Sequence, residues 1–119
     1  MARRYEQITE LYRQSTREIT SRPENWTSFL RSACRNYRLP FDELVLIYAQ
    51  RPDATAVLPI EGKNGWNKRF GRWVNRGATG IAVFDREYVH GTRLKYYFDI
   101  SDTHESRFAR PIPLWEVQS

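Results

Sequence analysis

The sequence predicts a single α+β domain in which about three N-terminal helices precede a small, mostly antiparallel sheet. Three observations lead to this prediction. Apolar residues recur at steps of three and four in the first half of the chain, which is typical of helices, and at steps of two in the second half, which is typical of strands. The helical segments all come before the strand segments, without the alternation that a parallel sheet requires. The 119 residues, free of internal repeats, suffice for one hydrophobic core.

Three helices are expected in the first half of the chain. Residues 4–20 have the apolar spacing of an amphipathic helix, which Pro23 interrupts. Asn25 is suited to cap a second helix, because its side chain can accept a hydrogen bond from a free backbone N–H. Pro40 suits the first turn of a third helix, where its missing N–H has no helical partner. The body of that helix, LVLIYA at 44–49, is apolar all round and is expected to be buried.

The second half predicts short strands and one helical turn. Segment 56–60 and the wholly apolar segment 81–84 are expected to be strands, the latter covered on both faces. A helical turn over 64–70 carries Trp66, for which a place in the core is favoured. The last extended segment, PIPLWEV at 111–117, starts with prolines that suit an edge strand.

Residues 92–100 alternate between the two faces of a further strand. One face carries four apolar side chains: Leu94, Tyr96, Phe98 and Ile100. The other face, which we expect to meet solvent, carries Arg93, Lys95, Tyr97 and Asp99. The exposed side of this strand is therefore expected to combine cations with an aromatic ring.

The run GRWVNRGATGIAVF at 71–84 contains three glycines. A phosphate-binding loop needs a helix N-terminus after its glycines, whereas Gly80 is followed here by a strand-like segment. The run instead predicts a hairpin whose turn is VNRG at 74–77. In that hairpin Gly77 takes a positive φ, and Gly71 and Gly80 flank the paired strands.

Basic charge is concentrated in two parts of the chain, which as a whole has a net charge of +5. Residues 1–38 hold eight Arg against four Glu, and residues 61–80 hold five Lys and Arg against one Glu. A chain of this kind is attracted to polyanions before any specific contact forms. Charge alone leaves open the alternative of a solvated, arginine-rich surface.

Cations and aromatic rings coincide around the predicted hairpin and the strand over 92–100. Proteins bind single-stranded nucleic acid with cations that follow the phosphates and with rings that stack on the bases. We therefore expect Trp73 and Tyr97 to stack on bases, with Lys63 and Arg51 at the margins of the site. For Trp73 a place in the core is an equal alternative. The predicted phosphate contacts are Lys68, Arg69, Arg72, Arg76, Arg93 and Lys95.

No catalytic site, metal site or cofactor is expected. His90 and His104 lie far apart and belong to no HExxH motif, and the single Cys34 excludes an internal disulfide. Cys34 is expected to be a small apolar filler. A polar cluster near a predicted strand end is read as a loop with its caps rather than a cation site; its members are Asp99, Asp102, His104 and Glu105.

The sequence predicts a cytoplasmic protein that does not contact a membrane. No apolar run approaches the roughly 20 residues that span a bilayer. Basic residues near the N-terminus are not followed by the apolar stretch of a signal peptide.

Three stretches resemble the N-terminal domain of ArdC-type antirestriction proteins: WTSFLRSACRNYRLPFDELVLIYAQRPDAT (26–55), GWNKRFGRWVNRGATGIAVFD (65–85) and YYFDISDT (96–103). The shared positions are Trp26, Phe29, Leu30, Gln50, Pro52, Ala54, Thr55, Trp66, Gly71, Arg72, Val74, Gly77, Gly80, Ile81, Phe98, Asp99, Ser101 and Thr103. The chain departs from the family at Asp42 and Glu43, where Asn and Gln or Leu are common. Two carboxylates near a helix start suit the helix but not a phosphate, so these residues are left out of the site.

The resemblance implies single-stranded DNA binding with little sequence preference, with RNA left open as a ligand. The ArdC-type domain also begins large multidomain proteins of conjugative transposons, which implies that this chain is part of a longer mobile-element protein whose other domains are its partners. Within residues 1–119 we expect an N-terminal helix (1–22), a family-like core (24–104) and a C-terminal extension (105–119). In ArdC this domain precedes a metallopeptidase-like domain that carries HExxH, a motif that residues 1–119 do not contain. The rival hypothesis is a protein-interaction module that docks through the aromatic hairpin, its basic charge being incidental.

Overall fold

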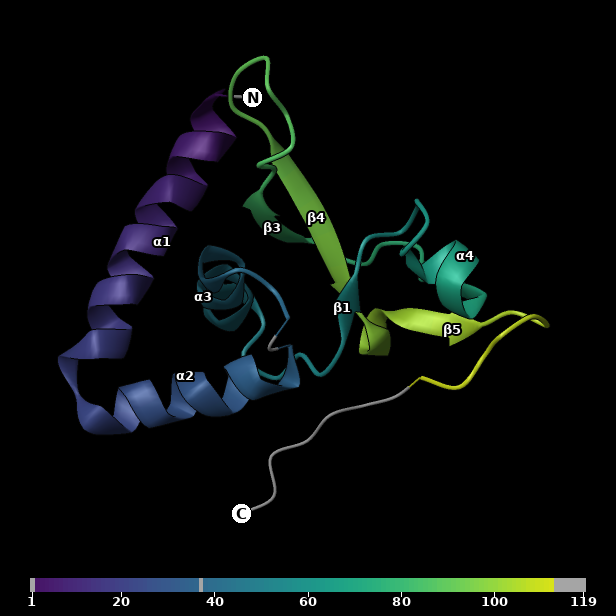
Figure 1. Ribbon diagram of the computed structural model, residues 1–119, viewed down its shortest axis with the longest axis horizontal. Coiled ribbons are helices and arrows are strands. Elements are labelled where there is room, and N and C mark those ends of the chain that lie inside the picture. The colour runs from purple at the N-terminus through teal and green to yellow at the C-terminus, as the bar shows by residue number, and fades with distance from the viewer. Residues whose placement is uncertain (1, 37, 113–119) are drawn as a thin grey trace.

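The structure is a computed structural model that describes residues 2–36 and 38–112. The molecule is flat, with extents of 46 × 43 × 24 Å; its three long helices lie toward the left of Figure 1 and its strands, with one short helix, toward the right. Three helices of ten or more residues precede the strands, so the predicted α+β class is confirmed. None of the described helices is both long and apolar enough to cross a lipid bilayer.

The three long helices are α1 (Ala2–Ser21), α2 (Pro23–Arg35) and α3 (Phe41–Gln50). The expected cap at Asn25 is wrong, because α2 already begins at Pro23, whose missing N–H suits the first helical position. The Asn25 side-chain amide instead donates to the Glu18 carbonyl oxygen at 3.0 Å, which ties α2 to α1. Pro40 takes the capping position directly before α3 rather than its first turn.

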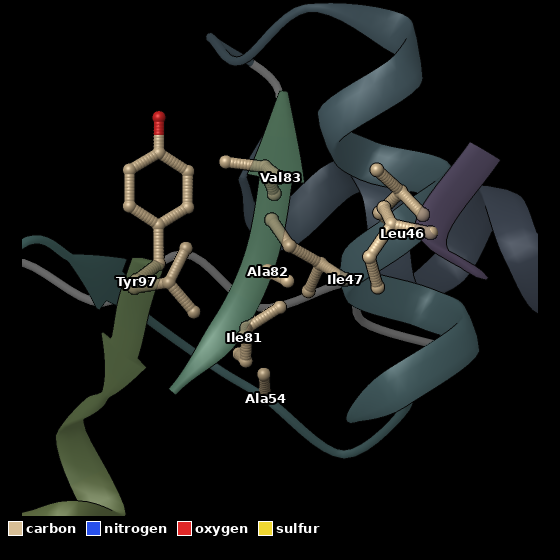
Figure 2. Close-up of a cluster of buried hydrophobic side chains, with 9 residues drawn as sticks. Leu46, Ile47, Ala54, Ile81, Ala82, Val83 and Tyr97 are labelled. Atoms are coloured by element: carbon tan, nitrogen blue, oxygen red, sulfur yellow. The ribbon is translucent and has the colours of Figure 1, made fainter. Parts of the chain in front are cut away.

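Helix α3 supplies much of the hydrophobic core. Val45, Leu46 and Ile47 are buried, whereas the other three residues of the apolar run at 44–49 are only partly buried. Figure 2 shows Leu46 and Ile47 of α3 on one side of β3 (Ile81–Phe84), with Tyr97 on the far side of that strand. The prediction of a buried third helix therefore holds for its centre.

Within residues 2–36 and 38–112, five strands form two separate antiparallel sheets. The larger sheet has the order β1 (Val57–Leu58), β4 (Leu94–Asp99), β3 (Ile81–Phe84). The smaller pairs β2 (Arg72–Val74) with β5 (Thr103–Glu105). The short helix α4 (Trp66–Phe70) precedes β2, and a single 3-10 turn, η1 (Ile100–Asp102), joins β4 to β5. The expected segment at 111–117 lies mostly outside the described residues, and residues 111–112 form no strand.

The predicted hairpin between β2 and β3 is wrong, although its turn is present. Gly77 has the expected positive φ of 84°, and Ala78 N donates to Asn75 O at 3.1 Å. The turn nevertheless joins strands of different sheets, because β2 pairs with β5 and β3 pairs with β4. Asn75 N extends the β2–β5 pairing by donating to Asp102 O at 2.8 Å.

The expected orientation of β4 is reversed. Tyr97 is 7% exposed and Asp99 is 2% exposed, whereas Tyr96 is 43% exposed. The cause is a carboxylate on α3, since the Tyr97 hydroxyl donates to Glu43 Oε1 at 2.5 Å and Lys95 Nζ lies 3.4 Å from Glu43 Oε2. The alternation along the strand was thus predicted correctly, but the inner and outer faces were exchanged at Tyr96, Tyr97 and Asp99, whereas Leu94 packs against the core as predicted.

A side chain closes the outer edge of β3. Gln50, the last residue of α3, donates from Nε2 to Ala82 O at 2.8 Å and accepts from Ala82 N at 3.0 Å through Oε1. Its Nε2 also donates to Leu46 O at 3.0 Å. The carboxamide takes the place that a neighbouring strand would occupy and fixes α3 against the sheet.

Candidate functional site

The polar loop after β4 is structural, as the sequence predicted. Asp99 accepts hydrogen bonds from the backbone of Thr55 at 2.8 Å and of Ala56 at 3.1 Å, and it caps η1 through Ser101 N at 3.1 Å. Arg51 Nη1 donates to Asp102 Oδ2 at 2.8 Å, and this hydrogen bond raises the pKa of Arg51 although burial opposes the shift. Arg51 therefore holds the fold together instead of lying at the margin of a binding site. No three His, Cys, Asp or Glu side chains of the described residues gather to hold a metal ion.

The predicted site residues on and beside β4 do not form a binding surface with β2. Arg93 Nε lies 3.4 Å from Asp85 Oδ2, and its guanidinium stacks 5.0 Å from the Tyr88 ring centroid. Lys95 is paired with the buried Glu43. Tyr97 cannot stack on a base, because burial places it in the core and raises its pKa far above the usual value of 10. The continuous groove expected from the sequence is wrong in this form.

Arg72 joins the two strands of the smaller sheet. Its side chain is only 13% exposed, and its Nε donates to Thr103 Oγ1 at 2.7 Å. Its Nη2 donates to Thr103 O at 3.2 Å, and its Nη1 lies 3.6 Å from Glu105. The predicted phosphate contact by Arg72 is therefore replaced by a structural role.

The remaining predicted cations belong to a compact part of the molecule that we call the basic unit, residues 62–78 and 103–112. It contains α4, β2 and β5, which lie together on the right of Figure 1 where β2 is unlabelled. The segment after β5 folds back onto the end of α4, since Ser106 N donates to Gly71 O at 3.1 Å and Arg110 N donates to Phe70 O at 2.9 Å. Gly71 has a φ of 63°, and a Cβ there would clash with the Phe108 carbonyl. Only glycine permits this approach.

The basic unit holds seven Lys and Arg residues against one acidic residue, Glu105. Its net charge of +6 exceeds the +5 of the whole chain, so the rest of the molecule is nearly neutral. Arg72 is paired with Glu105. Within the described residues, the other six cations form no ion pair with a carboxylate: Lys63, Lys68, Arg69, Arg76, Arg107 and Arg110.

Two large rings are exposed on the same unit. Trp73 is 50% exposed and Phe108 is 64% exposed, whereas Trp66 is fully buried and donates from Nε1 to Phe98 O at 2.7 Å. The core position expected for Trp66 is thus confirmed. In the β2–β5 register, Trp73 lies directly opposite His104, whose Nδ1 is 2.6 Å from Asn75 Oδ1. The Trp73 ring therefore lies near His104 on β5 and near the turn at 74–77 that carries Arg76.

The sequence reasoning missed the segment 107–110, although a signal for it was present. RFAR at 107–110 has the same pattern as RFGR at 69–72, with a cation on each side of a ring. The structure brings the two motifs together, because Arg110 Nη1 donates to the carbonyl oxygens of Arg69 at 3.0 Å and Lys68 at 3.3 Å. Such contacts also satisfy free carbonyl groups at the end of α4.

Many residues that carry the resemblance to ArdC-type domains have structural roles here. Gln50 caps the sheet edge, Trp66 fills the core, Gly71 admits the returning segment, and Asp99 caps the loop. These contacts show that the shared residues stabilise the fold, and they do not indicate a ligand. In comparisons with family models, with curated proteins and with solved structures, none matched this chain.

Proposed function

We propose that this chain binds single-stranded DNA through the basic unit, largely independently of base sequence and without catalysing a reaction. The observation that carries the proposal is the coincidence of six cations lacking carboxylate partners among the described residues with two exposed rings. Phosphates along a flexible strand are attracted to such cations with release of counterions. Its unpaired bases can stack on the rings, each contributing on the order of 1–3 kcal/mol.

The proposed contacts differ from those expected from the sequence alone. Trp73 and Phe108 are the stacking rings, with Lys63 at the margin. Five of the predicted residues are removed because they are buried or paired: Arg51, Arg72, Arg93, Lys95 and Tyr97. The phosphate contacts are Lys68, Arg69, Arg76, Arg107 and Arg110.

The biological setting of this proposal comes from the resemblance to ArdC-type domains. In that setting the chain belongs to a longer cytoplasmic protein of a mobile element and holds single-stranded DNA during transfer or processing. The neighbouring domains of the same polypeptide would be its protein partners.

Titration of fluorescent oligo-dT and of a matched duplex, each at two salt concentrations, tests the proposal. We expect tighter binding of the single strand, with log K falling by about 0.7 for each phosphate contact per unit of log[salt]. Lys68→Ala with Arg69→Ala should lower this slope. The control variant changes Arg13 and Arg17 to Ala on α1, where both cations are exposed and near Glu10. An equal effect of the two pairs, or a preference for the duplex, would contradict the proposal.

A specific observation also favours partner docking as a second candidate function. Trp26, Leu30 and Phe41 are 39%, 43% and 46% exposed, and the rings of Trp26 and Phe41 both contact that of Phe29. Exposed apolar groups that gather in this way mark protein interaction surfaces. If docking is the main function, binding of oligonucleotide will be weak, and capture of a protein partner will be insensitive to salt and to changes at Lys68.

A further inference from the structure

We propose that Tyr96 is a third base-stacking position and that a bound single strand continues from the basic unit across the outer face of the larger sheet, the face that carries Tyr96 and Phe98. This inference rests on the proposed function and extends its site. It also restores a role for β4, on the face opposite to the one that the sequence suggested. The occupant is the same single-stranded nucleic acid, extended along the sheet.

The outer face of the larger sheet is hollowed beside Tyr96. A shallow depression of about 450 Å³ is lined by Ile60, Glu61, Gly80, Tyr96 and Phe98. Gly80 leaves it open, because a Cβ at this position would lie 3.0 Å from Tyr96 Cβ and 3.1 Å from Phe98 Cζ. The volume falls within the roughly 300–1,000 Å³ of ordinary ligand pockets. A flat base can therefore lie on the exposed Tyr96 ring.

The depression beside Tyr96 adjoins the basic unit. Helix α4 is fixed to the loop that forms one side of the depression, since Trp66 N donates to Pro59 O at 2.9 Å and Asn67 N donates to Ile60 O at 3.2 Å. The Trp66 ring is bonded to the backbone of Phe98 in the same depression. A nucleic-acid strand bound at α4 can thus reach Tyr96 without crossing a helix.

The end of the proposed path that lies away from the basic unit carries a positive charge. Tyr96 also lines a second hollow of about 250 Å³, whose wall includes Arg4, Tyr5 and Arg93. The Arg4 side chain is exposed and forms no ion pair with any described carboxylate, whereas Arg93 is paired with Asp85 and adds no net charge to the hollow. Arg93, directly before β4, and Phe98 are five positions apart, about 17 Å at 3.3 Å per residue in an extended chain. Arg4 therefore places an exposed positive charge close to the Tyr96 ring, where it can attract the phosphates of a bound strand.

One residue on the path opposes the ligand. Glu61 is exposed at the rim of the depression and places a negative charge beside the proposed strand. Its removal gives a test of opposite sign, because Glu61→Gln should tighten binding of a strand that passes Tyr96 and should leave a strand confined to α4 and β2 nearly unaffected. Loss of folding cannot produce this increase in affinity.

The experiment compares oligo-dT of about 4 and about 16 nucleotides, the range of site sizes of small single-stranded-DNA-binding domains. We expect Tyr96→Ala to raise Kd for the long strand by about 5-fold or more and to leave Kd for the short strand unchanged. Tyr96→Phe, which keeps the ring, should retain wild-type affinity. The matched control is Phe41→Ala, because Phe41 is exposed to a similar extent (46%) but lies beside the acidic residues of α3.

The outcomes separate this inference from the proposed function. If Trp73→Ala weakens binding of both strands while neither Tyr96→Ala nor Glu61→Gln alters the long one, the basic unit binds DNA and the extension across the sheet is wrong. If neither strand binds, or if Trp73→Ala is also without effect, both proposals fail.

Discussion

Replacing Gly71 by Ala should separate the segment after β5 from helix α4 and so divide the basic unit. The residue has a φ of 63°, and its added Cβ would clash with the carbonyl oxygen of Phe108. Gly77 provides a matched control, because it also has a positive φ, of 84°, but has no atom within 4 Å of the added Cβ. The two substitutions therefore share the cost of a left-handed residue and differ only in the contact.

The magnitude follows from the hydrogen bonds that the clash would break. Gly77→Ala should destabilise the fold by about 1 kcal/mol, the cost of placing a Cβ in the left-handed region. Gly71→Ala adds the loss of contacts that Ser106 and Arg110 make with α4 and Gly71, each contributing about 0.5–1.5 kcal/mol. We expect Gly71→Ala to cost about 2–4 kcal/mol more than Gly77→Ala.

Urea unfolding followed by tryptophan fluorescence measures this difference, and limited trypsin digestion reports the position of the segment. In Gly71→Ala, cleavage after Arg107 should become faster, and affinity for oligo-dT should fall. In Gly77→Ala the cleavage rate and the affinity for oligo-dT should both stay near the wild-type values. Equal unfolding free energies and equal cleavage rates in the two variants would refute the reasoning, because the contact at Phe108 would then have no energetic weight.

Three further predictions concern the framework that holds the site. Gln50→Leu leaves the buried Ala82 N–H without its partner and should lower the unfolding free energy by about 2–4 kcal/mol, whereas exposed Gln14→Leu should change it little. Because burial raises the pKa of Tyr97 above 10, the folded state keeps this proton when the unfolded state has lost it. Stability should therefore fall as pH rises above about 10, and Tyr97→Phe should remove that part of the decline in a pH series of urea titrations. Asp99→Ala removes acceptors from three backbone N–H groups and should cost about 2–4 kcal/mol by thermal or urea unfolding.

The class of the fold and the identity of its core elements were predictable because they depend on local patterns. The run IAVF at 81–84 is buried as its composition indicates, and Trp66 sits at the start of a short helix in the core. The positive φ of Gly77 also follows from its place in a turn. Each of these features is encoded within a few residues of the position concerned.

The pairing of the strands and the inner face of β4 were not predictable, because both depend on distant partners. Alternation along β4 shows that Tyr96 and Tyr97 point to opposite sides, but only Glu43 on α3 decides which one is buried. Nothing near β2 in the sequence indicates that it pairs with β5. The proposed binding surface therefore includes residues 107–110, which the local sequence pattern had assigned to a C-terminal extension.

The carboxamide of Gln50 has a consequence for how this protein can associate. An uncovered strand edge invites a second polypeptide to add its own strand, which is a common route to oligomers and fibrils. With both polar groups of Ala82 occupied, β3 offers an interrupted template, and β1 at the opposite border is only two residues long. Recognition by backbone addition is therefore disfavoured at both borders, and a ligand of the larger sheet must instead approach its face. Gln50→Leu would reopen the border and should make the protein prone to self-assembly at high concentration.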